Sequence, residues 1–161
     1  MNKILEIFSV KTVISFIVAV FLVAFDRFLK ISALVNQDWS INLISEILKF
    51  NFAKNYNIAF SLPLGGMLLL GLVIICLVLL LFYFSYLFFK KDFSKFNCVI
   101  FVFLGAISNL IDRLRYGYVI DYLDLKYFTI FNLADVMISG GVACLLLLIF
   151  LEERGIKKMG R

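Results

Sequence analysis

The sequence predicts an all-α membrane protein with four transmembrane helices and a small extracytoplasmic β-rich cradle between the first two. Hydrophobic residues make up 63% of the 161 residues, against roughly 45–50% in ordinary soluble domains. Charged residues are only 17%, which excludes a disordered chain because disorder requires low hydrophobicity and high charge. The apolar residues form four runs of roughly 20 residues, the length that crosses a bilayer. We therefore expect one integral membrane domain, residues 1–161.

The four predicted transmembrane helices have physical markers at their ends. They cover about residues 12–35, 63–89, 96–114 and 132–151. The first continues through Asp26 without a small-residue cleavage site, so we interpret it as a retained helix and not as a cleaved signal peptide. The second has no charged residue and begins at Pro63, the only proline, which is tolerated in a first helical turn. The third is followed by Gly117, a typical helix stop.

The segments 36–62 and 115–131 connect these helices on one side of the membrane. Apolar and other residues alternate between Leu48 and Ala53, which predicts a half-buried strand. Lysine and arginine are more frequent in the N-terminal segment, the loop after the second helix and the C-terminal tail. Because basic residues gather on the cytoplasmic side, both termini are predicted to be cytoplasmic and both connecting segments extracytoplasmic. The net charge of +5 is therefore interpreted as a topology signal, and no nucleic-acid partner is expected.

Two residue counts restrict the chemistry. The chain has no histidine, which excludes Ser–His and Cys–His catalysis and histidine-ligated zinc. Cys76, Cys98 and Cys144 lie in separate apolar runs, so we interpret them as packing residues and not as a disulfide framework or a metal cluster. No metal or cofactor is expected.

Acidic residues gather near one membrane face. An acid at the centre of a span costs ~2.5–3.5 kcal/mol on insertion scales, so such residues are candidates for function. Those that are predicted near the extracytoplasmic face are Asp26, Asp112, Asp121, Asp124 and Asp135. Their common location makes one shared site geometrically reasonable.

Each polar residue also has a purely structural interpretation. Asp26 and Lys30 have the i,i+4 spacing of a helical ion pair. Asn109, Asp112 and Arg113 could link helices through hydrogen bonds. Asn132 and Asp135 resemble a helix N-cap and the acid of the helix's first turn. The acids of the 115–131 segment, Asp121 and Asp124, could simply be solvated.

Asp121 and Asp135 together suggest chemistry. They are 14 residues apart, across a short loop that re-enters the membrane. Two close carboxylates do not both ionise easily, so the pair shares a proton. One acid and one base can activate water and protonate a leaving amine. In a chain without histidine, this pair is the best general acid–base device available.

Four motifs occur in the order found in a known family. They are Asp26-x-x-x-Lys30, Asn55-Tyr-Asn-Ile-Ala59-Phe60-Ser61, Ser108-Asn109-Leu-Ile-Asp112-Arg113, and Val119-Ile-Asp121-Tyr-Leu-Asp124 followed by Phe131-Asn132-Leu-Ala134-Asp135. With this length and topology, the chain resembles the lipoprotein signal peptidases (signal peptidase II), bacterial membrane aspartyl proteases. Asn57 and Ser108 stand where that family usually has glycine.

The resemblance implies an enzyme of the bacterial cytoplasmic membrane whose catalytic dyad is Asp121 and Asp135, near the outer face. Seven further residues match positions that would bind substrate or support the dyad: Asp26, Lys30, Asn55, Asn109, Asp112, Arg113 and Asn132. The implied substrates are prolipoproteins with diacylglycerol on the lipobox cysteine, cleaved just before that cysteine. Further implied partners are membrane lipid and the inhibitor globomycin, and we expect a monomer.

Two other classes of function remain open. The same acids could form a relay in a proton- or ion-conducting subunit, but a relay places ionisable groups across the full membrane depth. Here the second helix has none, and the inner halves of the other three are uncharged. A structural subunit of a larger complex is the other alternative, and it predicts no activity for the purified protein.

Overall fold

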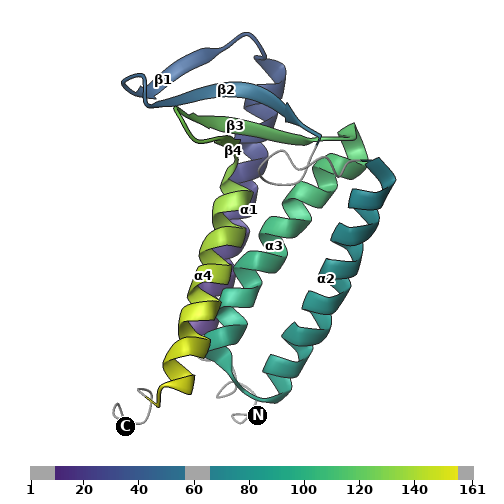
Figure 1. Cartoon of the computed structure of the whole chain (residues 1–161), viewed down its shortest axis with the longest axis vertical. Coiled ribbons are helices and arrows are strands. Elements are labelled where there is room, and N and C mark those ends of the chain that lie inside the picture. Colours follow the sequence, from purple (N-terminus) through teal and green to yellow (C-terminus); the bar gives the residue numbers. More distant parts are fainter. Residues whose placement is uncertain (1–9, 57–65, 156–161) are drawn as a thin grey trace.

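Four long helices and a small antiparallel sheet make up the described part of the chain (Figure 1). A computed structural model describes residues 10–56 and 66–155. The helices are α1 (Val10–Val35), α2 (Gly66–Phe89), α3 (Phe93–Tyr116) and α4 (Leu133–Glu153). The strands are β1 (Ser40–Ile44), β2 (Leu48–Asn55), β3 (Val119–Leu125) and β4 (Ile130–Phe131). The sheet lies at one end of the bundle, and α1 begins and α4 ends at the other.

All four helices are long and apolar enough to cross a membrane, as predicted. Their outward surfaces are apolar, with Phe21 65% and Phe82 70% exposed. Such surfaces suit lipid as the surrounding solvent and not water. This is a multi-pass membrane protein.

The helix ends follow local signals. The side chain of Asp92 accepts a hydrogen bond from the backbone N–H of Lys95 and caps the start of α3. Gly117 ends α3 with a left-handed conformation (φ 80°), which confirms the predicted stop. Helix α2 ends at Phe89, immediately before the charged residues 90–92. The predicted start of this helix at Pro63 lies outside the described residues.

Helix α3 is the central helix of the bundle and contacts α1, α2 and α4. Glycines allow α3 and α4 to approach closely. A Cβ atom at Gly105 would lie 2.7 Å from the backbone oxygen of Ala134, and one at Gly141 would lie 2.7 Å from Val102. The sulfur atoms of Cys98 and Cys144 lie 3.1 Å apart at this interface, as free thiols.

The four strands form one antiparallel sheet in the order β1-β2-β3-β4. The predicted strand in 48–53 is confirmed as β2, which extends to Asn55. Strands β3 and β4 come from the 115–131 segment, so the sheet draws on both connecting segments and not only on the one between α1 and α2. Residues Val119–Tyr122 are all buried, so this strand lacks the apolar–polar alternation that marks a half-buried one.

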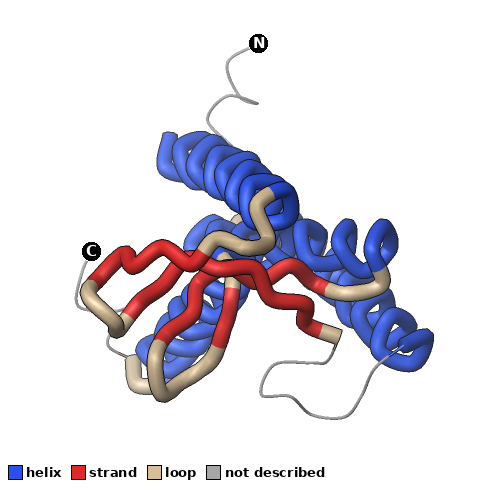
Figure 2. Tube along the Cα trace, turned by 90° about the horizontal axis from the view of Figure 1, so that it is seen from above, coloured by secondary structure: helices blue, strands red, loops and turns tan. Residues whose placement is uncertain are grey.

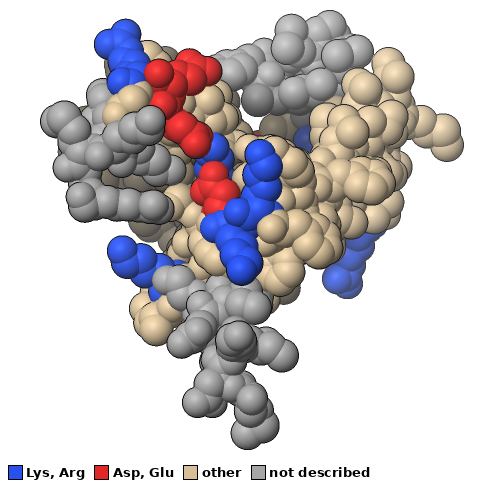
Figure 3. Space-filling model, turned by 90° about the horizontal axis from the view of Figure 1, so that it is seen from below, with Lys and Arg blue, Asp and Glu red and all other residues tan. Residues whose placement is uncertain are grey.

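The sheet packs against the ends of α1 and α3 and leaves α2 to one side, as Figure 2 shows from above. Below it lies a small core formed by Ala33, Phe50, Ile120 and Tyr122. A second core lies between the helices and comprises Ala19, Leu87, Phe96, Val99, Ile100 and Met137. At the end away from the sheet, basic and acidic side chains gather on the surface (Figure 3).

Candidate active site

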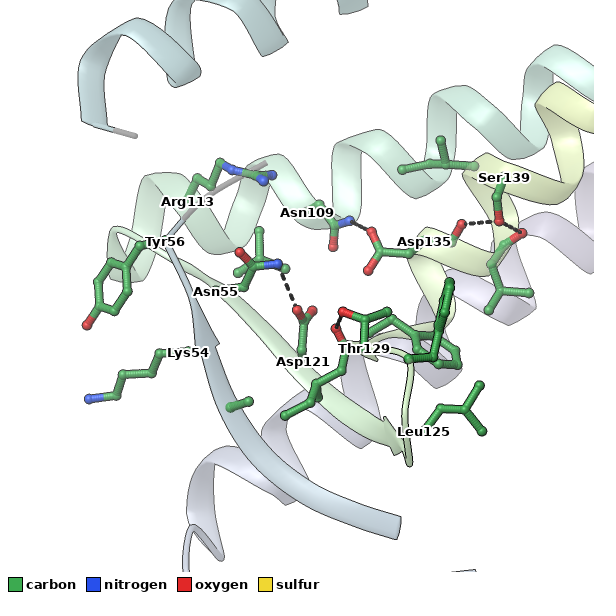
Figure 4. A pocket seen from close by; sticks show the side chains of 17 residues that line it. Lys54, Asn55, Tyr56, Asn109, Arg113, Asp121, Leu125, Thr129, Asp135 and Ser139 are labelled. Atoms are coloured by element: carbon green, nitrogen blue, oxygen red, sulfur yellow. Dashed lines mark hydrogen bonds between the residues drawn. The ribbon is translucent and has the colours of Figure 1, made fainter. Parts of the chain in front are cut away.

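A cavity of about 640 Å³ lies where β2 and β3 meet the sheet-side ends of α3 and α4. Figure 4 shows its lining side chains. Five residues that the sequence predicted as site residues line it: Asn55, Asn109, Arg113, Asp121 and Asp135. The structure therefore brings both members of the expected dyad to one cavity.

Asp121 lies on β3, opposite Ala53 of β2, and only 1% of it is exposed. Its two carboxylate oxygens accept hydrogen bonds from two side-chain amides. The Nδ2 atom of Asn132 lies 2.6 Å from Oδ1, and the Nδ2 atom of Asn55 lies 2.9 Å from Oδ2. Two different elements thus hold the carboxylate in one orientation.

Asp135 lies in the first turn of α4 and forms a capping box with Asn132. Its Oδ2 atom accepts from the backbone N–H of Asn132 (3.2 Å), and its own N–H donates to Oδ1 of Asn132 (2.9 Å). The N-cap interpretation of these two residues is therefore confirmed. Asp135 Oδ1 accepts a further hydrogen bond from Nδ2 of Asn109 on α3 (2.7 Å).

Asn132 connects the two carboxylates because it donates to Asp121 and caps the turn that carries Asp135. Burial, and then the neighbouring charge of Asp135, raise the pKa of Asp121 to about 7. The hydrogen bonds from Asn55 and Asn132 and the charge of Lys30 act in the opposite direction. A carboxyl group with this pKa beside a second carboxylate can share one proton with it near neutral pH.

A fully buried set of charges lies behind Asp135. Lys30 forms ion pairs with Asp26 (3.1 Å, i,i+4) and Asp112 (2.9 Å), and the side chains of all three have 0% exposed surface. The i,i+4 pair that the sequence predicted is thus present. Lys30 also donates to Oδ1 of Asn109 (2.7 Å), whose amide group in turn donates to Asp135. The buried charge of α1 is therefore one side chain away from Asp135.

Sequence reasoning missed three residues whose side chains bond to this set. Arg27 forms an ion pair with Asp112. The hydroxyls of Ser108 and Tyr122 donate to the two oxygens of Asp26, at 2.6 and 2.9 Å. Ser108 was visible in its motif only as a small residue. No pattern in the sequence marks Tyr122, because its strand shows no alternation.

Two predicted features remain, Asp124 and the second motif. Asp124 does not line the cavity and accepts instead from Nδ2 of Asn51 (3.0 Å). Asn55 and Tyr56 of that motif line the cavity, whereas Asn57 and residues 58–61 are not among the described residues.

Comparisons with known proteins agree on one family. The family model for signal peptidase (SPase) II matches residues 18–151. The lipoprotein signal peptidase of Caldicellulosiruptor bescii is 40% identical over 117 residues, covering 71% of this chain and 75% of that protein. That of Enterococcus faecalis is 31% identical over 150 residues, covering 91% and 93%.

Solved structures share the fold of this chain. A bacterial membrane enzyme solved by the in meso method at 2.3 Å resolution matches with a TM-score of 0.76 and 26% identity, covering 86% of this chain and 88% of that one. A second such structure, at 1.9 Å resolution, matches with a TM-score of 0.70 and 27% identity, covering 84% and 91%. The chain belongs to the signal peptidase II family.

Proposed function

We propose that this protein is an aspartic endopeptidase that removes the signal peptide from diacylglyceryl-modified prolipoproteins. It cleaves just before the lipidated cysteine, and Asp121 and Asp135 are its catalytic dyad. The observation that carries the proposal is that these two carboxylates line one cavity and share Asn132 as a hydrogen-bond partner. Membership of the signal peptidase II family supports the same reaction.

In the proposed reaction, one carboxyl of the pair is protonated and the other is ionised. The ionised carboxylate takes a proton from a water molecule, which attacks the scissile carbonyl carbon. A carboxyl group then protonates the leaving amine, the C–N bond breaks, and the pair returns to its singly protonated state. Carboxylates supply both acid and base, so the proposed reaction uses no metal or cofactor.

In this proposal, all of the other predicted site residues except Arg113 position this pair. Asn55 and Asn132 orient Asp121 through their amide groups, and Asn109 orients Asp135. Lys30 donates to Asn109 and also pairs with the buried carboxylates of Asp26 and Asp112, so it links Asn109 to them. Arg113 lines the cavity beside the dyad, where we propose that its guanidinium group binds substrate.

We also propose that the sheet and the cavity lie at the outer face of the cytoplasmic membrane, with both termini in the cytoplasm. The cavity lies at the sheet end of the helices, where a lipid-anchored peptide can reach it from the bilayer. Basic residues favour the opposite side as cytoplasmic. Those on the proposed cytoplasmic side are Lys3, Lys11, Lys90, Lys91, Lys95, Arg154, Lys157, Lys158 and Arg161. We also propose that the enzyme acts as a monomer.

The decisive experiment uses purified Asp121→Asn and Asp135→Asn proteins with a diacylglyceryl prolipoprotein and measures signal-peptide release on a gel. Each variant is expected to lose nearly all turnover, because asparagine neither takes up nor releases the proton. Globomycin is expected to block release by the wild-type protein. The matched control is Asp124→Asn, which changes an acid on the same strand that lies outside the cavity lining and is expected to retain activity. Near-normal turnover in either dyad variant contradicts the assignment.

A further inference from the structure

The first turn of α4 carries Asp135, and each of its free N–H groups has a side-chain partner. The start of a helix leaves such groups without partners inside the helix. Asp135 and Asn132 satisfy one another in the capping box. The N–H of Leu133 donates to the hydroxyl oxygen of Tyr122 (3.0 Å), and that of Ala134 donates to Oδ1 of Asp26 (3.2 Å).

Two of these partners come from outside α4. Asp26 lies on α1 and Tyr122 on β3, and they also bond to each other, since the Tyr122 hydroxyl donates to Asp26 Oδ1 (2.9 Å). The hydroxyl therefore acts as donor to α1 and as acceptor from α4 at the same time. Burial raises the pKa of Tyr122, so the phenol keeps the proton that this double role requires.

Tyr122 is adjacent in sequence to Asp121 on β3. Successive side chains of a strand point to opposite faces, so Asp121 faces the cavity while Tyr122 points away from it. Tyr122 is 0% exposed, and its ring packs against Phe50 with the ring centroids 5.6 Å apart. One side of β3 thus carries a proposed catalytic carboxylate, and the other side is bonded to the turn that carries its partner.

We propose that Tyr122 is a positioning residue that sets the placement of Asp135 relative to Asp121 by joining β3 to the first turn of α4. This inference rests on the dyad mechanism proposed above and extends it to a residue that does not line the cavity. Without the hydroxyl, the N–H of Leu133 loses its acceptor and Asp26 loses one of its donors. The first turn of α4 then has one hydrogen bond fewer to β3. As a result, Asp135 adopts its catalytic placement relative to Asp121 less often.

The test is Tyr122→Phe, which keeps the ring and its packing and removes only the hydroxyl. Turnover of a diacylglyceryl prolipoprotein is measured at a temperature well below the unfolding midpoint of each protein and is normalised to folded protein. We expect kcat to fall by about 10-fold, because a misplacement of reacting groups by about 1 Å is enough for such losses. KM is expected to stay within about twofold, because the hydroxyl contributes no direct contact to the cavity. Tyr127→Phe is the matched control, since it removes a hydroxyl from a side chain that is 95% exposed, and it is expected to behave as wild type.

Amide hydrogen exchange gives a second measurement that does not depend on substrate. Peptides covering residues 131–137 are expected to exchange faster in Tyr122→Phe, while peptides from the middle of α3 remain unchanged. A kcat within twofold of wild type overturns the proposal, and so does unchanged exchange at the start of α4. A variant that does not fold overturns it too, since Tyr122 would then determine folding and not position. If the wild-type protein does not cleave the lipidated precursor, the proposed function fails, but the exchange measurement still decides whether Tyr122 restrains α4.

Discussion

The two ends of the helix bundle carry similar ion pairs in different surroundings. At the sheet end, Lys30 pairs with Asp26 and Asp112, and all three side chains have 0% exposed surface. At the other end, Lys95 pairs with Glu152, and these side chains are 14% and 53% exposed. Ion pairs near water contribute little to stability, whereas a buried charge that loses its partner is expensive. We infer that the first group fixes the site and that the second only joins the ends of α3 and α4.

The largest effect is expected from Lys30→Met. The substitution leaves two carboxylates buried without their shared cation and removes the donor to Asn109. Breaking a buried ion pair on one side costs roughly 3–5 kcal/mol, so we expect a large fall in the thermal unfolding midpoint in detergent and no measurable turnover. An unfolding midpoint within 2 °C of wild type (about 0.5–1 kcal/mol for a chain of this size) contradicts the inferred difference between the ends.

A smaller effect is expected from Gly105→Ala. The new Cβ would lie 2.7 Å from the backbone oxygen of Ala134 and 3.0 Å from Ile138, so the first turn of α4 has to move. Overpacking of this kind costs about 1–3 kcal/mol, and displacement of Asp135 is expected to lower turnover by about 10- to 100-fold. Gly140→Ala is the control, because nothing lies within 4 Å of its added Cβ. Equal turnover in the two variants would show that the approach of α3 and α4 does not set the site.

The bundle was predictable from the sequence and half of the sheet was not. Four apolar runs bounded by charges, a proline and a glycine predict four spans, because length and hydropathy decide whether a segment crosses a bilayer. Strand β2 was predictable because apolar and other residues alternate from Leu48 to Ala53. Strand β3 was not, since burial of four consecutive residues, Val119–Tyr122, removes the alternation.

For the site, the residue types were predictable but most contacts were not. The sequence placed the acids near one face, and the family resemblance named the residues. The bond from Lys30 to Asn109 spans 79 positions in the chain, and that from Tyr122 to Asp26 spans 96. Such contacts depend on how the helices and the sheet pack. The local pairs, Asp26 with Lys30 and Asn132 with Asp135, were the contacts that spacing alone predicted.

The effect of Asp121→Asn on stability is expected to depend on pH. The pKa of Asp121 is about 7 in the fold, against about 3.9 in an unfolded chain. The folded state therefore binds this proton more tightly, so the resulting stability is present in full below pH of about 4 and is lost as the pH rises through about 7. Asparagine resembles the protonated acid, so the variant is expected to unfold about 2–5 °C higher than wild type at pH 8. At pH 4 no such gain is expected, and a gain of equal size at both pH values would contradict the raised pKa.

The smallest effect is expected from Lys95→Met, the same substitution as at Lys30 but at the opposite end. Lys95 bonds to Glu152 on α4 and to Asp92, the N-cap of α3 (3.1 Å). Glu152 is more than half exposed, so water replaces much of what it loses. We expect the free energy of unfolding to fall by at most about 1 kcal/mol. This difference from wild type is expected to shrink at high salt, because salt screens an exposed ion pair, and turnover is expected to stay unchanged. A loss as large as that of Lys30→Met would mean that position along the bundle, and not burial, determines what an ion pair contributes in this fold.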